Sequence, residues 1–205
     1  MAAARFVLHH HLQSRAQRIK WLLEEAGVPY EIVAHDLEAG THKRPEFLKL
    51  NPGGKIPTLV DRGPEGGAEA VVTESAAIVI HVADAAPEAG LAPPPGSPER
   101  GPYLTWIVYA ASAMEPALMD AMFPRVTPTP SGMTGWPSFD DALKRVHDAV
   151  TPGPWLLGDT FSAADVMVGS FLGWLRGWNK LPEPERFDAY LGRIAQRPAH
   201  KRAFS

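Results

Sequence analysis

The sequence predicts an α/β domain followed by an all-α domain, and three observations support this prediction. The chain begins with a strand, helix, strand order, and a hairpin opened by a proline comes next. Beyond a proline-rich segment, alternation typical of strands gives way to helical periodicity. We therefore expect an α/β domain over residues 1–86, a linker over 87–98 and a helical domain over 99–205.

The first part of the chain reads as a strand over residues 5–9, an amphipathic helix over 14–26 and a second strand over 30–33. Ile19, Leu22, Leu23 and Ala26 fall on one face of this helix, and Gly27 is placed to end it. Such a strand, helix, strand unit predicts two parallel strands joined by a crossover.

The hairpin is expected over residues 56–60 and 70–73, with a helix over 76–85 behind it. Pro57 cannot donate a ladder hydrogen bond, which favours an edge strand, and the Ile56–Pro57 bond is a candidate for the cis isomer. The N–H and C=O of Ile56 are then available to pair with the backbone of an extended ligand.

The helix start at Thr73-Glu74-Ser75 has the chemistry to hold the two charged groups of a free amino acid. Ser75 lies where unpaired N–H groups and the positive end of the helix dipole attract a carboxylate. Glu74 can accept hydrogen bonds from an ammonium. A plain hairpin before a capped helix would explain either residue alone, but not the combination with Pro57.

The second half of the chain predicts long helices over residues 103–114 and 139–150. A further helix start is marked by Phe161-Ser162-Ala163-Ala164-Asp165-Val166. Ser162 is suited to the N-cap, and Asp165 can return its carboxylate to the backbone of Ser162 in a capping box.

Composition excludes several classes of function. The 205 residues carry a net charge of −3 without a basic cluster, so we expect no nucleic-acid partner, and no apolar run reaches the length of a membrane span. A cytoplasmic location is the default expectation. The chain has no cysteine, which excludes disulfides and a cysteine nucleophile, so any thiol must come from the ligand.

These motifs and their order resemble the cytosolic glutathione S-transferases, in particular bacterial-type members that use a serine. The resemblance implies a thioredoxin-like N-terminal domain, glutathione as co-substrate, and an all-helical C-terminal domain. Trp155-Leu156-Leu157-Gly158-Asp159 ahead of the capping box, and Arg197-Pro198 near the end, extend it over nearly the whole chain. It also implies a homodimer and conjugation of glutathione to a small hydrophobic electrophile.

Ser14 is the hydroxyl at the junction of the first strand and helix, and the resemblance makes it the catalytic candidate. A thiol with a pKa near 8.5 needs a shift of about 2 units, or about 2.7 kcal/mol, to be mostly ionised at neutral pH. A hydrogen bond and a helix dipole can supply this. Ser14 as a simple cap, or Gln13 or a backbone N–H as the thiol donor, stay open.

Further binding residues are implied by the same resemblance. His42, Lys43 and Lys55 match positions that contact the glycine carboxylate of glutathione, although a solvated basic loop would look the same. The complete set implied for glutathione is Gln13, His42, Lys43, Lys55, Ile56, Pro57, Glu74 and Ser75.

The electrophile is expected on an apolar wall, although aromatic and methionine stripes are more often core. The wall residues are His11, Leu12, Trp106, Tyr109, Ala113 and Met114.

The run His9-His10-His11 invites a metal site, but alternate residues of a strand point to opposite faces, so we expect no metal. Two other functions remain open at this point. One is a glutathione-dependent reductase of disulfides or peroxides, and the other is a non-catalytic module that binds glutathione or a hydrophobic ligand.

Overall fold

The computed structural model describes residues 4–64, 67–127 and 129–205. These residues form two compact units. Unit 1 comprises Met1–Leu91 together with Arg197–Ser205, and unit 2 comprises Ala92–Gln196. None of the helices formed by the described residues is both long and apolar enough to cross a membrane.

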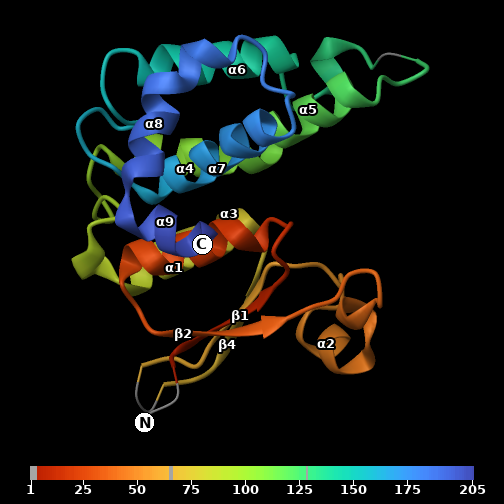
Figure 1. The fold of residues 1–205 in the computed structure, drawn as a ribbon, viewed down its shortest axis with the longest axis vertical. Coiled ribbons are helices and arrows are strands. Elements are labelled where there is room, and N and C mark those ends of the chain that lie inside the picture. The colour runs from red at the N-terminus through yellow and green to blue at the C-terminus, as the bar shows by residue number, and fades with distance from the viewer. Residues whose placement is uncertain (1–3, 65–66, 128) are drawn as a thin grey trace. The chain divides into compact units, whose positions relative to one another are not determined.

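The described part of unit 1 contains a mixed sheet of four strands in the order β2-β1-β3-β4 (Figure 1). β1 pairs in parallel with β2 and antiparallel with β3, and β3 pairs antiparallel with β4. The parallel pair confirms the predicted strand, helix, strand unit. The strands are β1 Phe6–His10, β2 Tyr30–Ala34, β3 Thr58–Asp61 and β4 Ala70–Thr73.

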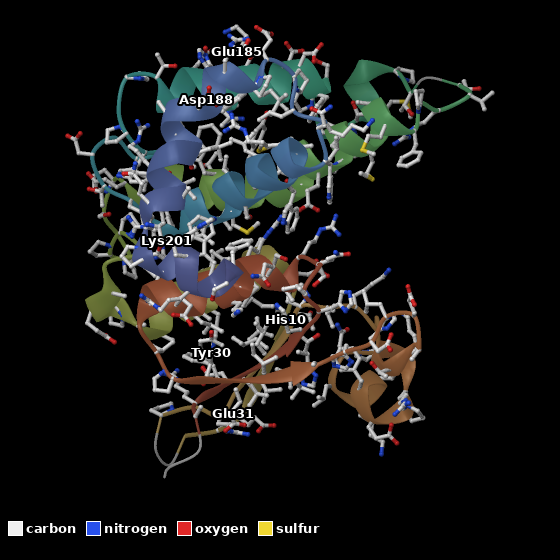
Figure 2. All side chains as sticks on the ribbon, viewed as in Figure 1. His10, Tyr30, Glu31, Glu185, Asp188 and Lys201 are labelled. Atoms are coloured by element: carbon white, nitrogen blue, oxygen red, sulfur yellow. The ribbon has the colours of Figure 1, made fainter. Side chains whose placement is uncertain are left out.

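The register of these pairs brings three loops to one end of the sheet. Thr58 lies opposite His9 on β1 and opposite Thr73 on β4. The segment that follows β1, the segment that precedes β3 and the segment that follows β4 therefore leave the sheet together. We call this the Thr58 end, and Figure 2 shows His10 there.

The other end of the sheet is marked by Asp61, which lies opposite Phe6 on β1 and Ala70 on β4. We call this the Asp61 end. Tyr30 and Glu31, at the start of β2, lie toward it in Figure 2, as the parallel register of β1 and β2 requires.

The prediction that Pro57 opens an edge strand is wrong, because β3 lies between β1 and β4. The strand begins at Thr58, one residue after Pro57, so the missing N–H removes no ladder hydrogen bond. The Ile56–Pro57 bond is cis, as predicted. Within the described residues, neither the N–H nor the C=O of Ile56 has a hydrogen-bond partner. The backbone groups are thus available although the strand is interior.

Helix α1 (Ala16–Ala26) buries the predicted apolar face, with Ile19, Leu22 and Leu23 fully covered. It ends at Gly27, whose φ of +64° is a left-handed conformation that glycine adopts without strain. Helix α1 packs against α3 and α9 (Figure 1). The other helices of unit 1 are α2 Pro45–Leu50, α3 Ser75–Ala85 and α9 Pro198–Phe204, with 3₁₀ turns at Thr41–Lys43 and Pro87–Ala89.

The final helix belongs to unit 1, whereas the sequence placed residues 99–205 in one helical domain. Arg197 forms a bidentate pair with Glu25 on α1, with N···O distances of 2.6 and 2.7 Å. Gln17 donates from Nε2 to the carbonyl oxygen of Ala203 at 2.5 Å. Contacts between residues so distant in sequence are not visible in local patterns. The predicted linker, residues 87–98, also spans the border between the units at 91 and 92.

Unit 2 is helical in its described residues. Residues 100–122 form a nearly continuous helical run in which a π-helical turn, Ala110–Met114, separates α4 (Arg100–Tyr109) from α5 (Glu115–Met122). The predicted helix over 139–150 is confirmed as α6 (Phe139–Val150). Two more helices are α7 Ala163–Gly177 and α8 Asp188–Gln196, with 3₁₀ turns at Ser131–Met133 and Pro184–Phe187.

The predicted capping box at the start of α7 is confirmed. Ser162 accepts from the N–H of Ala164 at 3.3 Å, and Asp165 accepts from the N–H of Ser162 at 2.9 Å. Asp165 also accepts from the N–H of Leu156 and from the Tyr190 hydroxyl. Burial raises the pKa of Asp165, and these hydrogen bonds oppose that shift. The box therefore anchors two other segments of unit 2 as well as the helix start.

Candidate functional site

The side chain of Asn51 stabilises the loop that carries Ile56 through hydrogen bonds. The amide nitrogen of Asn51 donates to the Lys55 carbonyl at 2.8 Å and to Thr58 Oγ1 at 3.0 Å, and its amide oxygen accepts from the N–H of Gly53 at 3.0 Å. Asn51 is buried. Its three hydrogen bonds fix the turn before Ile56 and leave the backbone of Ile56 itself unpaired.

Lys43 stabilises the same turn through hydrogen bonds from its ammonium group. Its Nζ donates to the carbonyl oxygens of Gly54 at 2.7 Å and Gly53 at 3.3 Å. Gly54 has φ +56°, a conformation that favours glycine, and a Cβ there would lie 2.6 Å from Lys43 Nζ and displace the lysine ammonium from this turn. The ammonium of Lys43 is therefore already hydrogen-bonded to backbone carbonyl groups of the protein.

The other two basic residues of the predicted carboxylate site differ from Lys43. Lys55 is exposed, and its ammonium has no hydrogen bond or ion pair within the described residues. His42 is half-buried, with a buried Nδ1 that lacks a hydrogen-bond partner. Lys55 is thus the freest cation of the three, and His42 offers an unsatisfied nitrogen.

Glu74 and Ser75 form the start of α3 at the Thr58 end. Glu74 has φ 67° and ψ 125°, a region that non-glycine residues rarely adopt and that costs about 1–3 kcal/mol. Its side chain is exposed and makes no capping hydrogen bond. Ser75 is 8% exposed, and neither its hydroxyl nor its N–H has a partner in the described chain. The helix start is therefore unsatisfied and open to an acceptor ligand.

Ser14 lies at the junction of β1 and α1, as predicted, but its hydroxyl is occupied. It donates to the carbonyl oxygen of His11 at 2.7 Å and accepts from the N–H of Ala16 at 3.1 Å. In this arrangement Ser14 holds the loop and has no proton to offer a thiol. Gln13 is exposed beside it.

The three consecutive histidines go to different partners. His9 Nδ1 lies 2.9 Å from His35 Nε2, beside the Phe47 ring, and burial lowers the pKa of His9 to about 4. His10 Nε2 lies 2.8 Å from Gln17 Oε1, and burial lowers its pKa as well. Among the described residues, no three His, Cys, Asp or Glu side chains are grouped to hold a metal ion.

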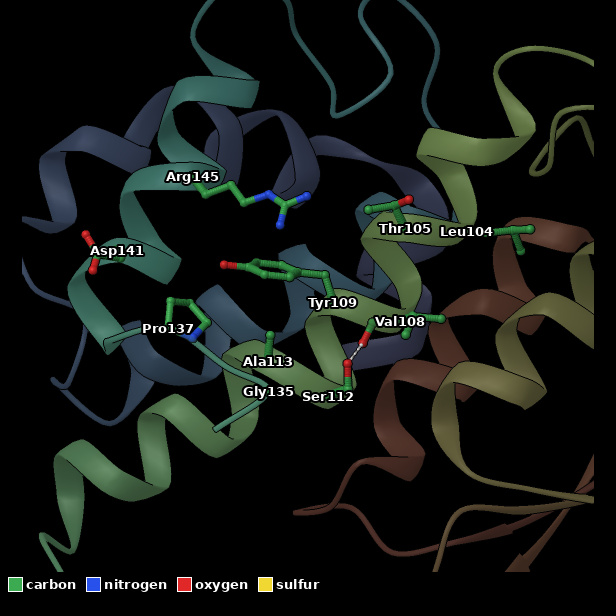
Figure 3. A pocket seen from close by; sticks show the side chains of 10 residues that line it. All are labelled: Leu104, Thr105, Val108, Tyr109, Ser112, Ala113, Gly135, Pro137, Asp141 and Arg145. Carbon is green, nitrogen blue, oxygen red and sulfur yellow. Dashed lines mark hydrogen bonds between the residues drawn. The ribbon is translucent and has the colours of Figure 1, made fainter. Parts of the chain in front are cut away.

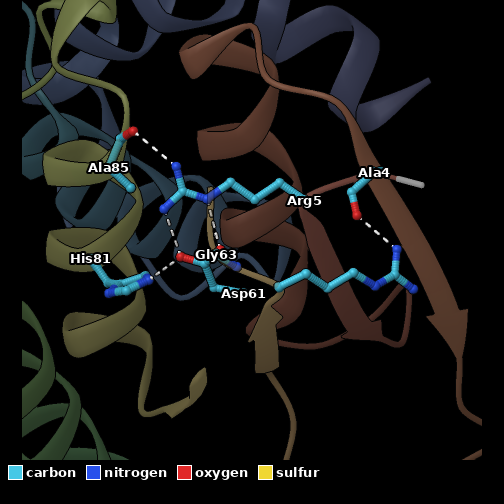
Figure 4. Close-up of polar contacts among 7 residues, drawn as sticks. Ala4, Arg5, Asp61, Gly63, His81 and Ala85 are labelled. Atoms are coloured by element: carbon cyan, nitrogen blue, oxygen red, sulfur yellow. Dashed lines mark hydrogen bonds and ion pairs between the residues drawn. The ribbon is translucent and has the colours of Figure 1, made fainter. Parts of the chain in front are cut away.

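The Asp61 end of the sheet has a closed polar cluster instead (Figure 4). Asp61 accepts from Arg5 Nε at 2.7 Å, from His81 Nε2 at 2.8 Å and from the N–H of Gly63 at 2.8 Å. These donors hold the pKa of Asp61 at about 2, below its ordinary value, although burial acts in the opposite direction. Every acceptor oxygen of this carboxylate has a partner, so no ligand is needed here.

Unit 2 has a pocket of about 790 Å³ between α4, the segment around Pro137 and α6 (Figure 3). Tyr109 and Ala113, two of the residues expected on the electrophile wall, line it, and the Arg145 guanidinium lies 4.2 Å from the centre of the Tyr109 ring. Burial raises the pKa of Tyr109. Trp106 and Met114 do not line this pocket, and Met114 is fully buried in the core.

Two predicted wall residues lie in unit 1. His11 is half-buried, and Leu12 is 66% exposed.

Sequence reasoning gave no individual role to two residues that shape the site. One is Asn51, and the signal that could have marked it is its place as a polar residue directly before the turn residues Pro52-Gly53-Gly54. His35, whose carbonyl oxygen accepts from His11 Nδ1 at 2.9 Å, has no local signal. Its contact arises only when β2 pairs with β1.

Comparisons with known proteins agree with this architecture. The family models for the glutathione S-transferase N-terminal and C-terminal domains match residues 5–84 and 100–202. Disulfide-bond oxidoreductase YfcG of Escherichia coli K12 is 30% identical over 168 residues, which cover 80% of this chain and 75% of that protein. Glutathione S-transferase GstA of Escherichia coli O157:H7 is 27% identical, and 89% of each chain is covered.

A solved glutathione S-transferase structure also has the same overall fold as this chain. The sphingomonad glutathione S-transferase complexed with glutathione has a TM-score of 0.76 and 28% identity, and the match covers 97% of this chain and 96% of that one. With both family models matched in order along the chain, the protein belongs to the glutathione S-transferase family.

Proposed function

We propose that this protein binds glutathione at the Thr58 end of its sheet and transfers it to small hydrophobic electrophiles. The observation that carries the proposal is the convergence of unsatisfied polar groups there. The N–H and C=O of Ile56, the Ser75 hydroxyl and the first N–H groups of α3 share this end. Membership of the family assigns the class of reaction.

Each free group suits one part of the peptide. The backbone of Ile56 pairs with the central cysteine, because an extended peptide can add its own N–H and C=O to an open strand end. Ser75 and the start of α3 take the γ-glutamyl carboxylate, and Glu74 takes the ammonium. Lys55, with His42, faces the glycine carboxylate. Lys43 contributes mainly by holding the Gly53-Gly54 turn.

Ser14 is proposed as the hydrogen-bond donor to the glutathione thiolate. For this the hydroxyl turns from the carbonyl oxygen of His11 to the sulfur, at the start of α1, where the helix dipole favours negative charge. Ser14→Ala is expected to lower the conjugation rate at saturating glutathione about tenfold, the effect of one charge-assisted hydrogen bond. An unchanged rate would assign the donor role to Gln13 or to a backbone N–H.

The electrophile is proposed to bind in unit 2, beside Tyr109 at the end of α4 and Ala113 in the π-helical turn that follows. The support from the structure is that both residues line an open pocket of this unit. Tyr109→Ala should raise KM for an aryl halide and leave the Kd of glutathione unchanged.

The main experiment combines binding and turnover. Isothermal titration with glutathione, conjugation of an aryl halide and reduction of a glutathione mixed disulfide are measured on the same preparation. We expect binding and conjugation to exceed disulfide reduction. The disulfide reduction assay is included because the YfcG relative is named a disulfide-bond oxidoreductase, and faster reduction than conjugation would contradict the transferase proposal.

Two variants and a matched control locate the site. Glu74→Gln and Ser75→Ala each remove a contact worth about 1.5–3 kcal/mol, so glutathione affinity should fall about ten- to a hundredfold while folding is kept. Glu69→Gln is the control, because Glu69 is also an exposed carboxylate but lies at the Asp61 end, ahead of β4. Equal affinities in all three variants would show that the site lies elsewhere.

A cytoplasmic location and a homodimer complete the proposal. Both are typical of the family, and sedimentation of the purified chain tests the second directly. A monomer at micromolar concentration would contradict it.

A further inference from the structure

Transfer of glutathione needs an acceptor for the thiol proton as well as a donor for the thiolate. Ser14 fills only the second role, since a neutral hydroxyl stabilises a thiolate but does not keep the proton that leaves the sulfur. Water can accept this proton, and a base with a free lone pair at the Thr58 end would accept it more readily. The role of such a base rests on the proposed glutathione transferase function.

His11 has a tautomer that the structure fixes. Its Nδ1 lies 2.9 Å from the carbonyl oxygen of His35, and a carbonyl oxygen can only accept, so Nδ1 carries the proton. In the neutral ring Nε2 then holds the lone pair. Within the described residues Nε2 has no hydrogen-bond partner, and the side chain is half-buried. His11 thus presents an oriented, unoccupied base.

The carbonyl that orients His11 is itself held firmly. The N–H of His35 donates to the carbonyl oxygen of His10 at 2.7 Å. The imidazole of His35 contacts His9 Nδ1 at 2.9 Å and Thr41 Oγ1 at 3.2 Å. His35 therefore serves as a positioning residue, and the orientation of the His11 ring does not depend on a mobile partner.

The strand register brings His11 and the unpaired backbone of Ile56 to the same end of the sheet. β1 and β3 are antiparallel, with His9 opposite Thr58. β1 ends at His10 and β3 begins at Thr58, so His11 directly follows β1 and Ile56 lies two residues ahead of β3 at the same end of the sheet. A cysteine residue paired with Ile56 would therefore bring its thiol to the end of the sheet where His11 lies.

The other groups around His11 are poorer proton acceptors. Burial lowers the pKa of both His10 and His35, and their contacting nitrogens already have partners. Arginine and lysine have no lone pair to offer while charged. Asp36 accepts from the N–H of Ala39 at 2.9 Å. The charged or titratable groups on the flanking elements are His10, Arg15, His35, Asp36, Lys55 and Glu74.

We propose that His11 Nε2 takes the proton of the glutathione thiol. The S–H bond breaks, its electron pair stays on sulfur, and a new N–H bond forms on His11, which becomes an imidazolium next to the thiolate. The thiolate then forms a C–S bond with the electrophile as the leaving group departs with its bonding pair, and the imidazolium returns its proton to solvent. A thiolate–imidazolium pair of this kind is an established way to activate a thiol.

His11→Asn tests the proposal, because its amide nitrogen can still donate to the His35 carbonyl but offers no basic nitrogen. The Kd of glutathione should stay within about twofold. The conjugation rate at neutral pH should fall about a hundredfold or more, the usual size of a general-base effect. This loss should shrink as the pH approaches the pKa of the free thiol, near 8.5, because the thiol then ionises without help. Ultraviolet absorbance of the bound thiolate gives a second readout.

His147→Asn is the matched control, since His147 lies on α6 in unit 2 and contacts Thr151 rather than any site residue. It should leave the rate, the pH profile and the thiolate absorbance unchanged. His11→Gln is the second variant if His11→Asn melts early. A His11 variant that binds glutathione and keeps the wild-type rate and thiolate absorbance at neutral pH would overturn the proposal. Failure of the wild-type protein to bind glutathione would instead refute the proposed function.

Discussion

The two ends of the sheet in unit 1 differ in how their polar groups are satisfied. At the Asp61 end, the carboxylate of Asp61 is enclosed by Arg5, His81 and the N–H of Gly63. At the Thr58 end, Ile56 and Ser75 present backbone and hydroxyl groups without partners in the described chain. The same four strands support both arrangements.

This difference separates groups that stabilise the fold from groups that await a ligand. Buried polar groups in proteins are nearly always paired, so unpaired groups at one place indicate a missing partner. The strained backbone of Glu74 lies at the unpaired end, where such strain is often retained for function. Substitutions at the Asp61 end should therefore change stability, and those at the Thr58 end should change affinity.

The largest expected effect is on stability, from Asp61→Asn. The change removes the buried carboxylate that pairs with the partly exposed side chains of Arg5 and His81, and loss of one partner from such a cluster costs about 3 kcal/mol. Urea unfolding measures the loss. The folded variant should bind glutathione with the same affinity as the wild type. A higher Kd would show that the Asp61 end affects ligand binding as well as stability.

The pH dependence of stability should come from the same carboxylate. The folded pKa of Asp61 is about 2, against an ordinary 3.8, so its contribution is present above pH 3.8 and is lost as the pH falls toward 2. The shift corresponds to about 2 kcal/mol. The stability gap between wild type and Asp61→Asn should narrow by that amount between about pH 5 and about pH 2. A gap independent of pH would contradict this origin.

Asn51→Ala should affect both properties, because Asn51 supports the loop at the ligand end. Three hydrogen bonds are lost from a buried side chain, which should lower the free energy of unfolding by about 2 kcal/mol. The Kd of glutathione should rise about tenfold, since the Ile56 backbone is no longer fixed. Normal affinity in this variant would show that the loop needs no support from Asn51.

Glu74→Gly should give the smallest change in stability, and in the opposite direction. Glycine tolerates positive φ, so the variant should be about 1 kcal/mol more stable than the wild type while it binds glutathione more weakly. Glu69→Gly is the matched control, because Glu69 does not have a positive φ and should lose a little stability. If both Glu74→Gly and Glu69→Gly stabilise the protein, or if neither does, the result would argue against backbone strain at Glu74.

Local patterns predicted the parts of the fold that depend on neighbouring residues. Gly27 ends α1 and Ser162 caps α7 because each acts within one turn of its own position. The interior place of β3 was not predictable from Pro57, because strand order is set by pairing with distant strands. The packing of α9 on α1 was missed for the same reason.

The candidate site was predictable in its residues but not in their hydrogen bonds. Ile56, Glu74 and Ser75 lie together at the Thr58 end, as the motif order suggested. The engagement of the Ser14 hydroxyl with the carbonyl oxygen of His11 depends on the loop conformation, which composition does not specify.

An NMR titration of the backbone amide groups with glutathione directly locates the binding site in unit 1. We expect the largest chemical-shift changes at the N–H groups of Ile56, Ser75 and Ala76, and these changes should saturate together with one Kd. Gly63 and His81, at the Asp61 end, should stay unchanged. Shifts concentrated at Gly63 and His81, with none at Ile56 and Ser75, would contradict this location of the site.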